Sequence, residues 1–340
     1  MYQERGGQSS FWGDPLYERI IPKGHFLKRL NELIEFKKVN EMVKDLYSKD
    51  MGRPCREPAM LFKMIYLQFM YNISDREIEE QVRYNMVYKW FVGLSAEELP
   101  PDHSTLSVFR ERLGADRFLE IFNWVVEEAR GKGFINNRLH IIDATAVAAR
   151  ADIIKFSGVK NGEMDERRDK NDKEDDKPSH PDQDARWGCK RKKESFFGYK
   201  MHAGMDADSE IITKVTVTPG NTADIVETFN IIDERADSVV GDKGYDSFYV
   251  QYTLRQRGIK SLIYRRMYKG RDESQKVRER GWIERKFSEC KGCHGLRMAR
   301  YWGLIKLKIQ GYMTAVVVNL KQMLKLATSP PAWLAIGSGH

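Results

Sequence analysis

Apolar residues recur at helical spacing through the first third of the chain, from residue 14 to about residue 115. Pro58–Tyr71 places its apolar side chains at the three- and four-residue intervals of an amphipathic helix. Ser74 follows, with Glu77 three residues later, which is the capping-box pattern that opens a helix. A third helix is expected after the proline pair that begins at Pro100. The pattern predicts an all-α region of short helices joined by tight turns.

This helical region has two interpretations. Its predicted exposed faces carry basic side chains, which favours a helix-turn-helix that binds DNA. The alternative is a helical bundle that only braces the following domain. The sequence leaves both open. The basic residues expected to be exposed are Arg76, Arg83, Lys89, Arg110 and Arg112.

Beyond Leu139 the apolar spacing changes from helical to extended. The order of elements is three strands, helix, strand, helix, strand and helix, with a further amphipathic helix behind. We therefore expect an α/β domain with a mixed sheet. The expected strands are Leu139–Ala148, Phe196–Asp206, Ile211–Thr218, Ser238–Gly241 and Lys260–Tyr264, and the expected helices are Ala223–Ala236, Asp246–Arg257, one that carries Glu284, and Leu304–Leu326.

A charged segment interrupts the extended region between the first two strands. Residues 155–194 contain few apolar side chains and two prolines, so they cannot build a core, and we expect a mobile loop. The predicted organisation is a flexible N-terminus, a helical domain, an α/β domain that includes this loop, and a disordered tail. The boundaries are 1–13, 14–130, 135–328 and 329–340.

Basic residues are concentrated at one end of the chain. Formal net charge is +8 and the pI is about 9.1, whereas residues 251–340 alone hold 19 Lys and Arg against 5 Asp and Glu. That third therefore carries +14 and the rest carries −6. A basic region interleaved with aromatic residues is typical of a surface that meets a polyanion such as nucleic acid.

The sequence predicts a cytoplasmic protein without membrane contact. Its first residues are polar, and its longest late apolar run, Met313–Leu320, is too short to span a bilayer. Four cysteines fit a reducing compartment and no disulfide framework. Cys290, Cys293 and His294 form a C-x-x-C-H string, but further zinc ligands are missing nearby, and we interpret the string as incidental.

Three acidic residues stand out by their positions. Asp143 interrupts an apolar strand, where a carboxylate is costly unless it is paired or bound to metal. Asp242 ends a second apolar strand, at the edge of the sheet where ligand sites form in α/β folds. Glu284 lies on a helix with Arg280 and Lys291, and the offsets of 4 and 7 residues put all three on one helical face.

These three carboxylates are expected to hold metal ions. If the two strands are neighbours, Asp143 and Asp242 converge and Glu284 arrives from its helix. Three carboxylates at one point repel one another unless cations neutralise them. Oxygen ligands without His or Cys select Mg²⁺ or Mn²⁺ over zinc. A pair of such ions about 4 Å apart suits in-line phosphoryl displacement.

At these residues the chain resembles the insertion-sequence transposases of bacteria and archaea that carry an RNase H-like DDE domain. The strand text IIDATAV holds Asp143, and VVGDKGYDS holds Asp242. The third segment is similar to the family signature Y-(2)-R-(3)-E-(6)-K, with Arg280, Glu284 and Lys291 in place and Val277 where the signature has Tyr. The helical text from WGDPLYERI to PDHSTLSVFR is also similar to this family, so the resemblance covers nearly the whole chain.

The resemblance implies a fold, a reaction and partners. The fold is an RNase H-like catalytic domain behind an all-α domain, with Asp143, Asp242 and Glu284 as metal-binding catalytic residues. The reaction is cleavage at transposon ends by water, followed by attack of the freed 3′-hydroxyl on target DNA. The partners are double-stranded DNA with terminal inverted repeats and a second copy of the chain, in the cytoplasm at the nucleoid.

Basic residues around the three acids are candidate DNA contacts. They are Arg280, Lys291, Lys200, Lys243, Arg297 and Arg300. Two interpretations are open for His202, which suits either a residue that orients DNA or a hydrogen-bonded sheet position. Asn221 and Asp224 suit a turn and a helix cap. Tyr245 follows Asp242 closely enough to contact a phosphate.

Two other functions remain open from the sequence. One is a domesticated, sequence-specific DNA-binding protein that no longer cuts. The other is an RNase H-like repair nuclease, which would cut branched or damaged DNA without defined ends. The presence of all three acids argues against the first.

Overall fold

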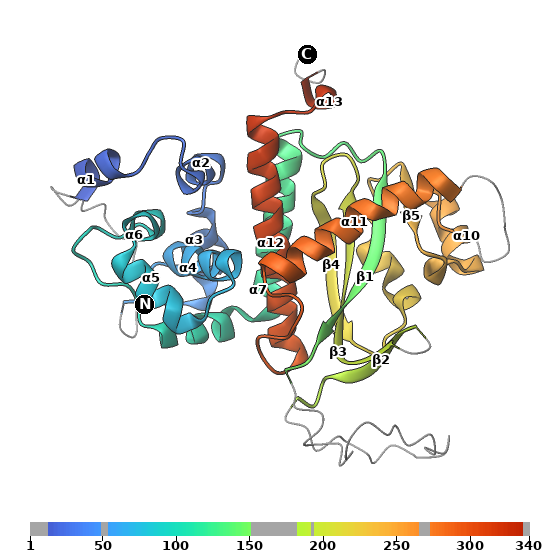
Figure 1. Ribbon diagram of the computed structural model, residues 1–340, viewed down its shortest axis with the longest axis horizontal. Coiled ribbons are helices and arrows are strands. Elements are labelled where there is room, and N and C mark those ends of the chain that lie inside the picture. The colour runs from blue at the N-terminus through green and yellow to red at the C-terminus, as the bar shows by residue number, and fades with distance from the viewer. Residues whose placement is uncertain (1–12, 49–53, 151–181, 192–193, 265–272, 336–340) are drawn as a thin grey trace.

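The computed structural model describes residues 13–48, 54–150, 182–191, 194–264 and 273–335, with the side chains of 13–14, 190–194, 273–280 and 332 left aside. Figure 1 shows helices at one side, a mixed sheet at the other, and two long helices upright between them. In the helical part the elements are α1 Gly13–Ile20, α2 Phe26–Leu33, α3 Lys38–Val43, η1 Lys44–Leu46, α4 Pro58–Tyr71, α5 Asp75–Tyr84, α6 Met86–Val92 and α7 His103–Gly131. They continue with β1 His140–Ala148, β2 Arg186–Arg191, β3 Glu194–Asp206, β4 Ile212–Pro219, η2 Asp224–Glu227, α9 Thr228–Ile231, β5 Ser238–Gly241, η3 Lys243–Tyr245, α10 Phe248–Gln256, β6 Lys260–Ser261, α11 Glu273–Cys293, α12 Leu304–Thr328 and α13 Ala332–Ala335.

The predicted helix boundaries hold where local signals are strong. α4 spans the predicted residues, and the capping box of Ser74 and Glu77 opens α5. Asn85 caps the next helix, α6, immediately after α5 ends, and Asp102 caps α7. The helical pattern of the first third is therefore confirmed.

Two of the basic residues expected to be exposed are buried instead. Arg110 is 6% exposed and forms an ion pair with Asp75. Lys89 is 5% exposed, and its ammonium donates to the carbonyl of Ala96 at 2.7 Å. The expectation is wrong for this pair because each cation finds a partner on another element, which satisfies its charge or its donors inside the fold. Arg76 and Arg83 lie on the surface, as predicted.

Within the described residues the sheet has six strands in the order β2-β3-β1-β5-β6, with β4 also paired to β3. β1 is antiparallel to β3 and parallel to β5, so the sheet is mixed as predicted. The sequence pattern missed β2, which occupies part of the expected 155–194 loop and pairs with the start of β3. Expectations for residues 155–181 and for 1–12 lie outside the described residues.

Three further predictions differ in extent from the structure. The helix expected over Ala223–Ala236 is only η2 and the single turn α9, because Ile232 is extended and Asp233 turns the chain next. The tail, expected to be disordered, contains the short helix α13. The strand expected to reach Tyr264 is assigned only over β6, although backbone bonds to β5 continue to that residue.

The two faces of the sheet pack on different helices. The face of β1 and β3 that carries Ile141 and Met201 joins the main core with α7, α11 and α12. The opposite face, with Ile142 and Val239, packs on α9 and α10. None of the helices over the described residues combines the length and the apolar character needed to cross a bilayer.

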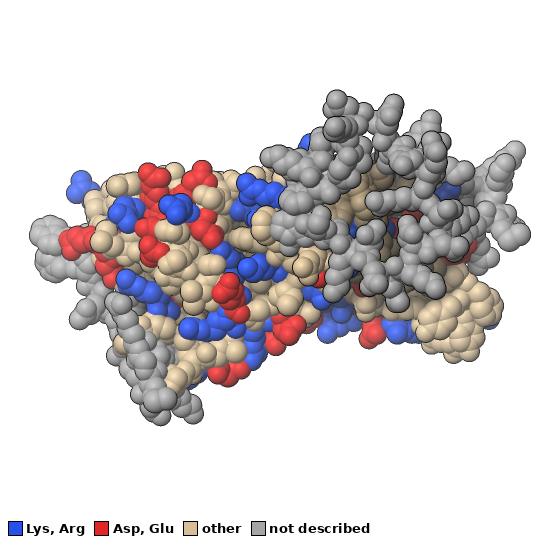
Figure 2. All heavy atoms as spheres, turned by 90° about the horizontal axis from the view of Figure 1, so that it is seen from below, with Lys and Arg blue, Asp and Glu red and all other residues tan. Residues whose placement is uncertain are grey.

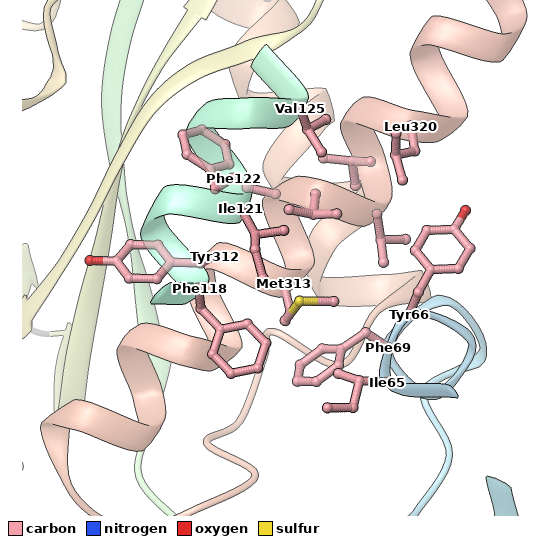
Figure 3. Packing of buried hydrophobic residues seen from close by; sticks show 14 of the residues in the cluster. Ile65, Tyr66, Phe69, Phe118, Ile121, Phe122, Val125, Tyr312, Met313 and Leu320 are labelled. Atoms are coloured by element: carbon pink, nitrogen blue, oxygen red, sulfur yellow. The ribbon is translucent and has the colours of Figure 1, made fainter. Parts of the chain in front are cut away.

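One continuous core joins the helical part to the sheet. Met313 of α12 lies among Phe69 of α4 and Phe118 and Ile121 of α7 (Figure 3). The other side of α12 meets β4, where buried Asn319 pairs with both backbone groups of Ile212 at 2.7 and 2.8 Å. The division into domains 14–130 and 135–328 stays a prediction, since both parts share this core.

We expect Met313→Ala to destabilise both parts together. The substitution leaves a cavity in the shared core, and a buried Met→Ala change costs about 2–5 kcal/mol of unfolding free energy. Urea denaturation measures this loss, and hydrogen exchange followed by mass spectrometry locates it. Protection should fall in α4 and β4 alike. The control is Met298→Ala at a half-exposed site, where the cost is within about 0.5 kcal/mol. Separate unfolding transitions for the two parts contradict a shared core.

Candidate active site

Pairing of β1 with β5 brings Asp143 and Asp242 to neighbouring positions. The parallel register runs from His140 opposite Val239 to Ile142 opposite Gly241, so each acid is the next residue on its strand. β5 ends there, and β1 continues to Ala148 with β3 on its other side. Beyond the end of β5, this edge of β1 is open, and Asp143 and Asp242 lie beside the opening. The predicted pairing of the two strands is confirmed.

α11 crosses the sheet in front of β1 and carries the third acid (Figure 1). Ile283 and Cys290 bury one side of the helix in the core. Glu284, Ser288 and Lys291, at helical spacing, line the same cavity as Asp143 and Asp242. The predicted common face is thus confirmed for Glu284 and Lys291. Arg280 belongs to α11, but its side chain lies outside the described residues.

The chain after α11 ties this helix to β1. The amide of Ala148 donates to the carbonyl of Arg297 at 3.1 Å, and the amide of Ala299 donates to the carbonyl of Ala148 at 2.8 Å. Because β1 holds Asp143, these backbone bonds set the position of α11 relative to the first acid.

The three acids share a cavity of about 500 Å³. Its wall holds four carboxylates and two ammonium groups, which leaves a formal charge of −2. Arrangements of this kind attract cations, since like charges destabilise one another. The lining residues are Asp143, Ala144, Thr145, Ala146, Cys189, Phe196, Lys200, Asp224, Asp242, Glu284, Phe287, Ser288 and Lys291.

Asp224 is the fourth carboxylate, and the sequence pattern missed its place. It was expected to cap a helix, yet its Oδ1 accepts a hydrogen bond from Lys200 Nζ at 2.9 Å. The same ammonium donates to the carbonyl of Thr222 at 2.9 Å. The local sequence gives no signal for this contact, because Lys200 lies on β3, 24 residues earlier in the chain.

His202 lies behind this pair as a buried sheet residue, which is one of its two expected roles. Its Nε2 is 2.8 Å from the hydroxyl of Thr218, and its Nδ1 lies 3.8 Å from Asp224 Oδ1. Burial lowers the pKa of His202 to about 4, against the opposing effect of the nearby Asp224 charge. The imidazole is therefore neutral at pH 7, and the wall gains no further positive charge from it.

The remaining predicted DNA contacts do not line the cavity. Lys243 is exposed on η3 beside Asp242, and Arg297 is exposed after α11. Arg300 donates to the carbonyl of Ile73 at 2.8 Å and stacks over Phe69 at 4.8 Å, so it joins the sheet part to α4. These roles stay predictions for Lys243 and Arg297.

Two sequence interpretations near the site have clear outcomes. Tyr245 is only 1% exposed and packs in the core against α10, so a phosphate contact is wrong for it.

Cys290 is also buried, which raises the pKa of its thiol to about 12. His294 lies 3.1 Å from the carbonyl of Met70, at the junction with α4. Cys290 and His294 therefore have structural roles, and Cys293 is exposed.

A closely spaced group of metal-ligand atoms lies elsewhere. Among the described residues, Glu79, Asp102 and His103 form the group whose ligand atoms all approach within 4.8 Å. Hydrogen bonds from the His103 amide and ring to Glu79, at 2.9 and 2.8 Å, account for it at the start of α7.

Charged side chains of both signs cover the lower face of the helical part (Figure 2). Lys and Arg there alternate with Asp and Glu instead of forming one uninterrupted basic stripe.

Comparisons with known proteins place the chain. A family model described as a transposase domain (DUF772) matches residues 15–112. A second, described as a transposase DDE domain, matches residues 137–320, more than half of the chain.

Solved structures with some likeness are also transposases. The piggyBac transposase synaptic complex with hairpin DNA is 11% identical, with 91% of this chain and 81% of that chain covered and a TM-score of 0.41. The pre-cleavage Mos1 transpososome is 10% identical, with 93% and 91% covered and a TM-score of 0.24.

The DDE match spans the elements that carry the three acids, from β1 through β5 to α11. The expected fold class, an RNase H-like α/β catalytic domain behind an all-α region, and the expected enzyme class both follow from it. The chain belongs to the DDE transposase family and is a DNA transposase.

Proposed function

We propose that Asp143, Asp242 and Glu284 are the catalytic carboxylates of this transposase. The observation that carries the proposal is their meeting in one cavity, although they come from β1, the end of β5 and α11. Each element is held by the others: β1 pairs with β5, and the segment after α11 pairs with β1. A site of three acids on three rigid elements suits chemistry that needs stable geometry.

The donor set fits hard divalent cations. DDE transposases use divalent metal ions. In this cavity the carboxylates supply oxygen ligands, and the lining residues include no histidine. We propose Mg²⁺, with Mn²⁺ as a substitute, held by Asp143, Asp242 and Glu284. When bound, such ions stabilise charge on the attacking and leaving oxygens of a phosphodiester.

The lysines of the cavity are proposed to receive the DNA backbone. Lys291 lies on α11, three residues beyond Ser288, and Lys200 lies on the opposite wall. Their ammonium groups offset part of the negative wall, so a phosphate can approach between them. Water or a DNA 3′-hydroxyl is the nucleophile we propose for cleavage and joining.

We propose double-stranded DNA as the partner, recognised at terminal inverted repeats and at a target. α5 and α6, separated by one residue, offer a helix-turn-helix arrangement with Arg76 and Arg83 on the surface. Joining two ends calls for two active sites, so we propose a homodimer on DNA. Each copy supplies the cavity for one end.

Neutral substitution of each acid is expected to abolish cleavage while DNA binding survives. Asp143→Asn, Asp242→Asn and Glu284→Gln keep the side-chain shape but remove a ligand charge. Losing several kcal/mol of charge stabilisation corresponds to about a thousandfold or more in rate. Cleavage of labelled DNA carrying the element's ends, in Mg²⁺, measures the rate, and a gel shift measures binding.

Asp237→Asn is the matched control and should cut normally, because Asp237 is exposed and lies at the opposite end of β5 from Asp242. A variant that still cuts removes its acid from the catalytic set. Binding by the unmodified protein with no metal-dependent cleavage supports a domesticated DNA-binding protein instead.

Lys291→Gln is expected to weaken DNA binding and its dependence on salt. One phosphate contact fewer lowers the slope of log K against log salt by about 0.9. Fluorescence anisotropy at several salt concentrations measures the slope. Lys132→Gln, at the exposed end of α7, serves as the control lysine. An unchanged slope for Lys291→Gln makes that lysine structural.

A further inference from the structure

Lys200 and Asp224 form the wall of the cavity opposite α11. In the register of β1 with β3, Lys200 lies opposite Ala146 and His202 opposite Ala144. Asp143 points to the other face of β1, since successive strand residues alternate. β1 has no strand beside it on this edge beyond the end of β5, so the cavity is lined by residues from both faces of the sheet. Lys200 and Lys291 therefore approach the cavity from two sides.

The Lys200 ammonium is held by two acceptors. Its three N–H donors include one to Asp224 Oδ1 and one to the carbonyl of Thr222, each at 2.9 Å. Its side chain is 15% exposed, so little freedom remains to it. These contacts orient the charge before any substrate arrives and leave a third donor for a ligand in the cavity.

Asp224 is itself held in place. The turn after β4 brings it back over β3: the amide of Thr222 donates to the carbonyl of Pro219 at 3.1 Å, and that of Gly220 to the carbonyl of Gly198 at 2.9 Å. Gly220 is required at this close approach, because a Cβ there would lie 2.6 Å from the carbonyl of Arg186. Asp224 then stands between Lys200 and the His202 ring.

We propose that Asp224 is a positioning residue that orients Lys200 toward the phosphate undergoing cleavage, rather than a fourth metal ligand. The inference rests on the proposed function of the cavity. Asp224 Oδ1 is already engaged by the ammonium, and the carboxylate belongs to η2 rather than to the paired strands β1 and β5 that position Asp143 and Asp242. Lys200 is then the group that contacts the substrate, and Asp224 acts through it.

The test is a double-mutant cycle with Asp224→Asn, Lys200→Met and the double variant, assayed for single-turnover cleavage and for DNA affinity. Each single substitution should slow cleavage by about 10- to 100-fold, the size of a lost charge-assisted hydrogen bond. The double variant should be no slower than Lys200→Met, because both changes remove one function. Losses that multiply overturn the proposal.

Two further measurements separate positioning from other roles. Asp224→Asn retains the lysine charge, so its salt dependence of DNA binding should match the unmodified protein, whereas Lys200→Met should lower the slope. The Mg²⁺ concentration for half-maximal cleavage should be unchanged in Asp224→Asn. A rise in that concentration makes Asp224 a metal ligand and overturns the proposal. If Asp224→Asn and Lys200→Met both lower the melting temperature and weaken DNA binding to the same extent, the pair is merely structural and the proposal is overturned.

Asp143→Asn, run in parallel, reports on the proposed function separately. If Asp143→Asn still cuts, the assignment of the cavity fails. If Asp143→Asn is inactive and the Asp224 and Lys200 losses multiply, only the positioning role fails.

Discussion

Like-charged carboxylates that share a cavity repel one another, so the scaffold must hold each of them against that force. The protein does this with backbone pairing. Asp143 and Asp242 each follow the last paired residues of β1 and β5, Ile142 and Gly241, and the chain after α11 adds backbone bonds to the end of β1. The acids are therefore held by strands and a helix rather than by flexible loops. Divalent cations can then neutralise a site that is already formed.

Side-chain contacts and a shared core connect the active site to the helical part. α11 ends beside α4, where His294 approaches the carbonyl of Met70 and Arg300 donates to the carbonyl of Ile73. α12 then packs between α4, α7 and the sheet, in a core that continues across both parts (Figure 3). The helical region is thus joined by buried contacts to the helix that carries Glu284. Movement of one part without the other would expose this core.

Local rules account for what the sequence predicted well. Asp143 and Asp242 stood out because acids are costly within or at the end of apolar strands, and helical periodicity put Glu284 and Lys291 on one face. The capping box at Ser74 needs only three neighbouring residues. Each of these signals lies within a few positions of the chain.

Long-range partners account for what the sequence missed. Asp224 faces the cavity because of Lys200, 24 residues away, and Arg110 is buried because of Asp75, 35 residues away. β2 pairs with the start of β3, but its charged residues hide the strand alternation. Ile232 ends the expected helix after one turn because it joins the core beneath the sheet. Spacing along the chain carries no information about such contacts.

Anomalous X-ray scattering from crystals soaked in Mn²⁺ tests the metal-binding role of the three acids most directly. We expect anomalous peaks in the cavity lined by Asp143, Asp242 and Glu284, and their loss in crystals of Glu284→Gln. Peaks confined to Glu79, Asp102 and His103, or no peak in the cavity at saturating Mn²⁺, would contradict the proposed active site.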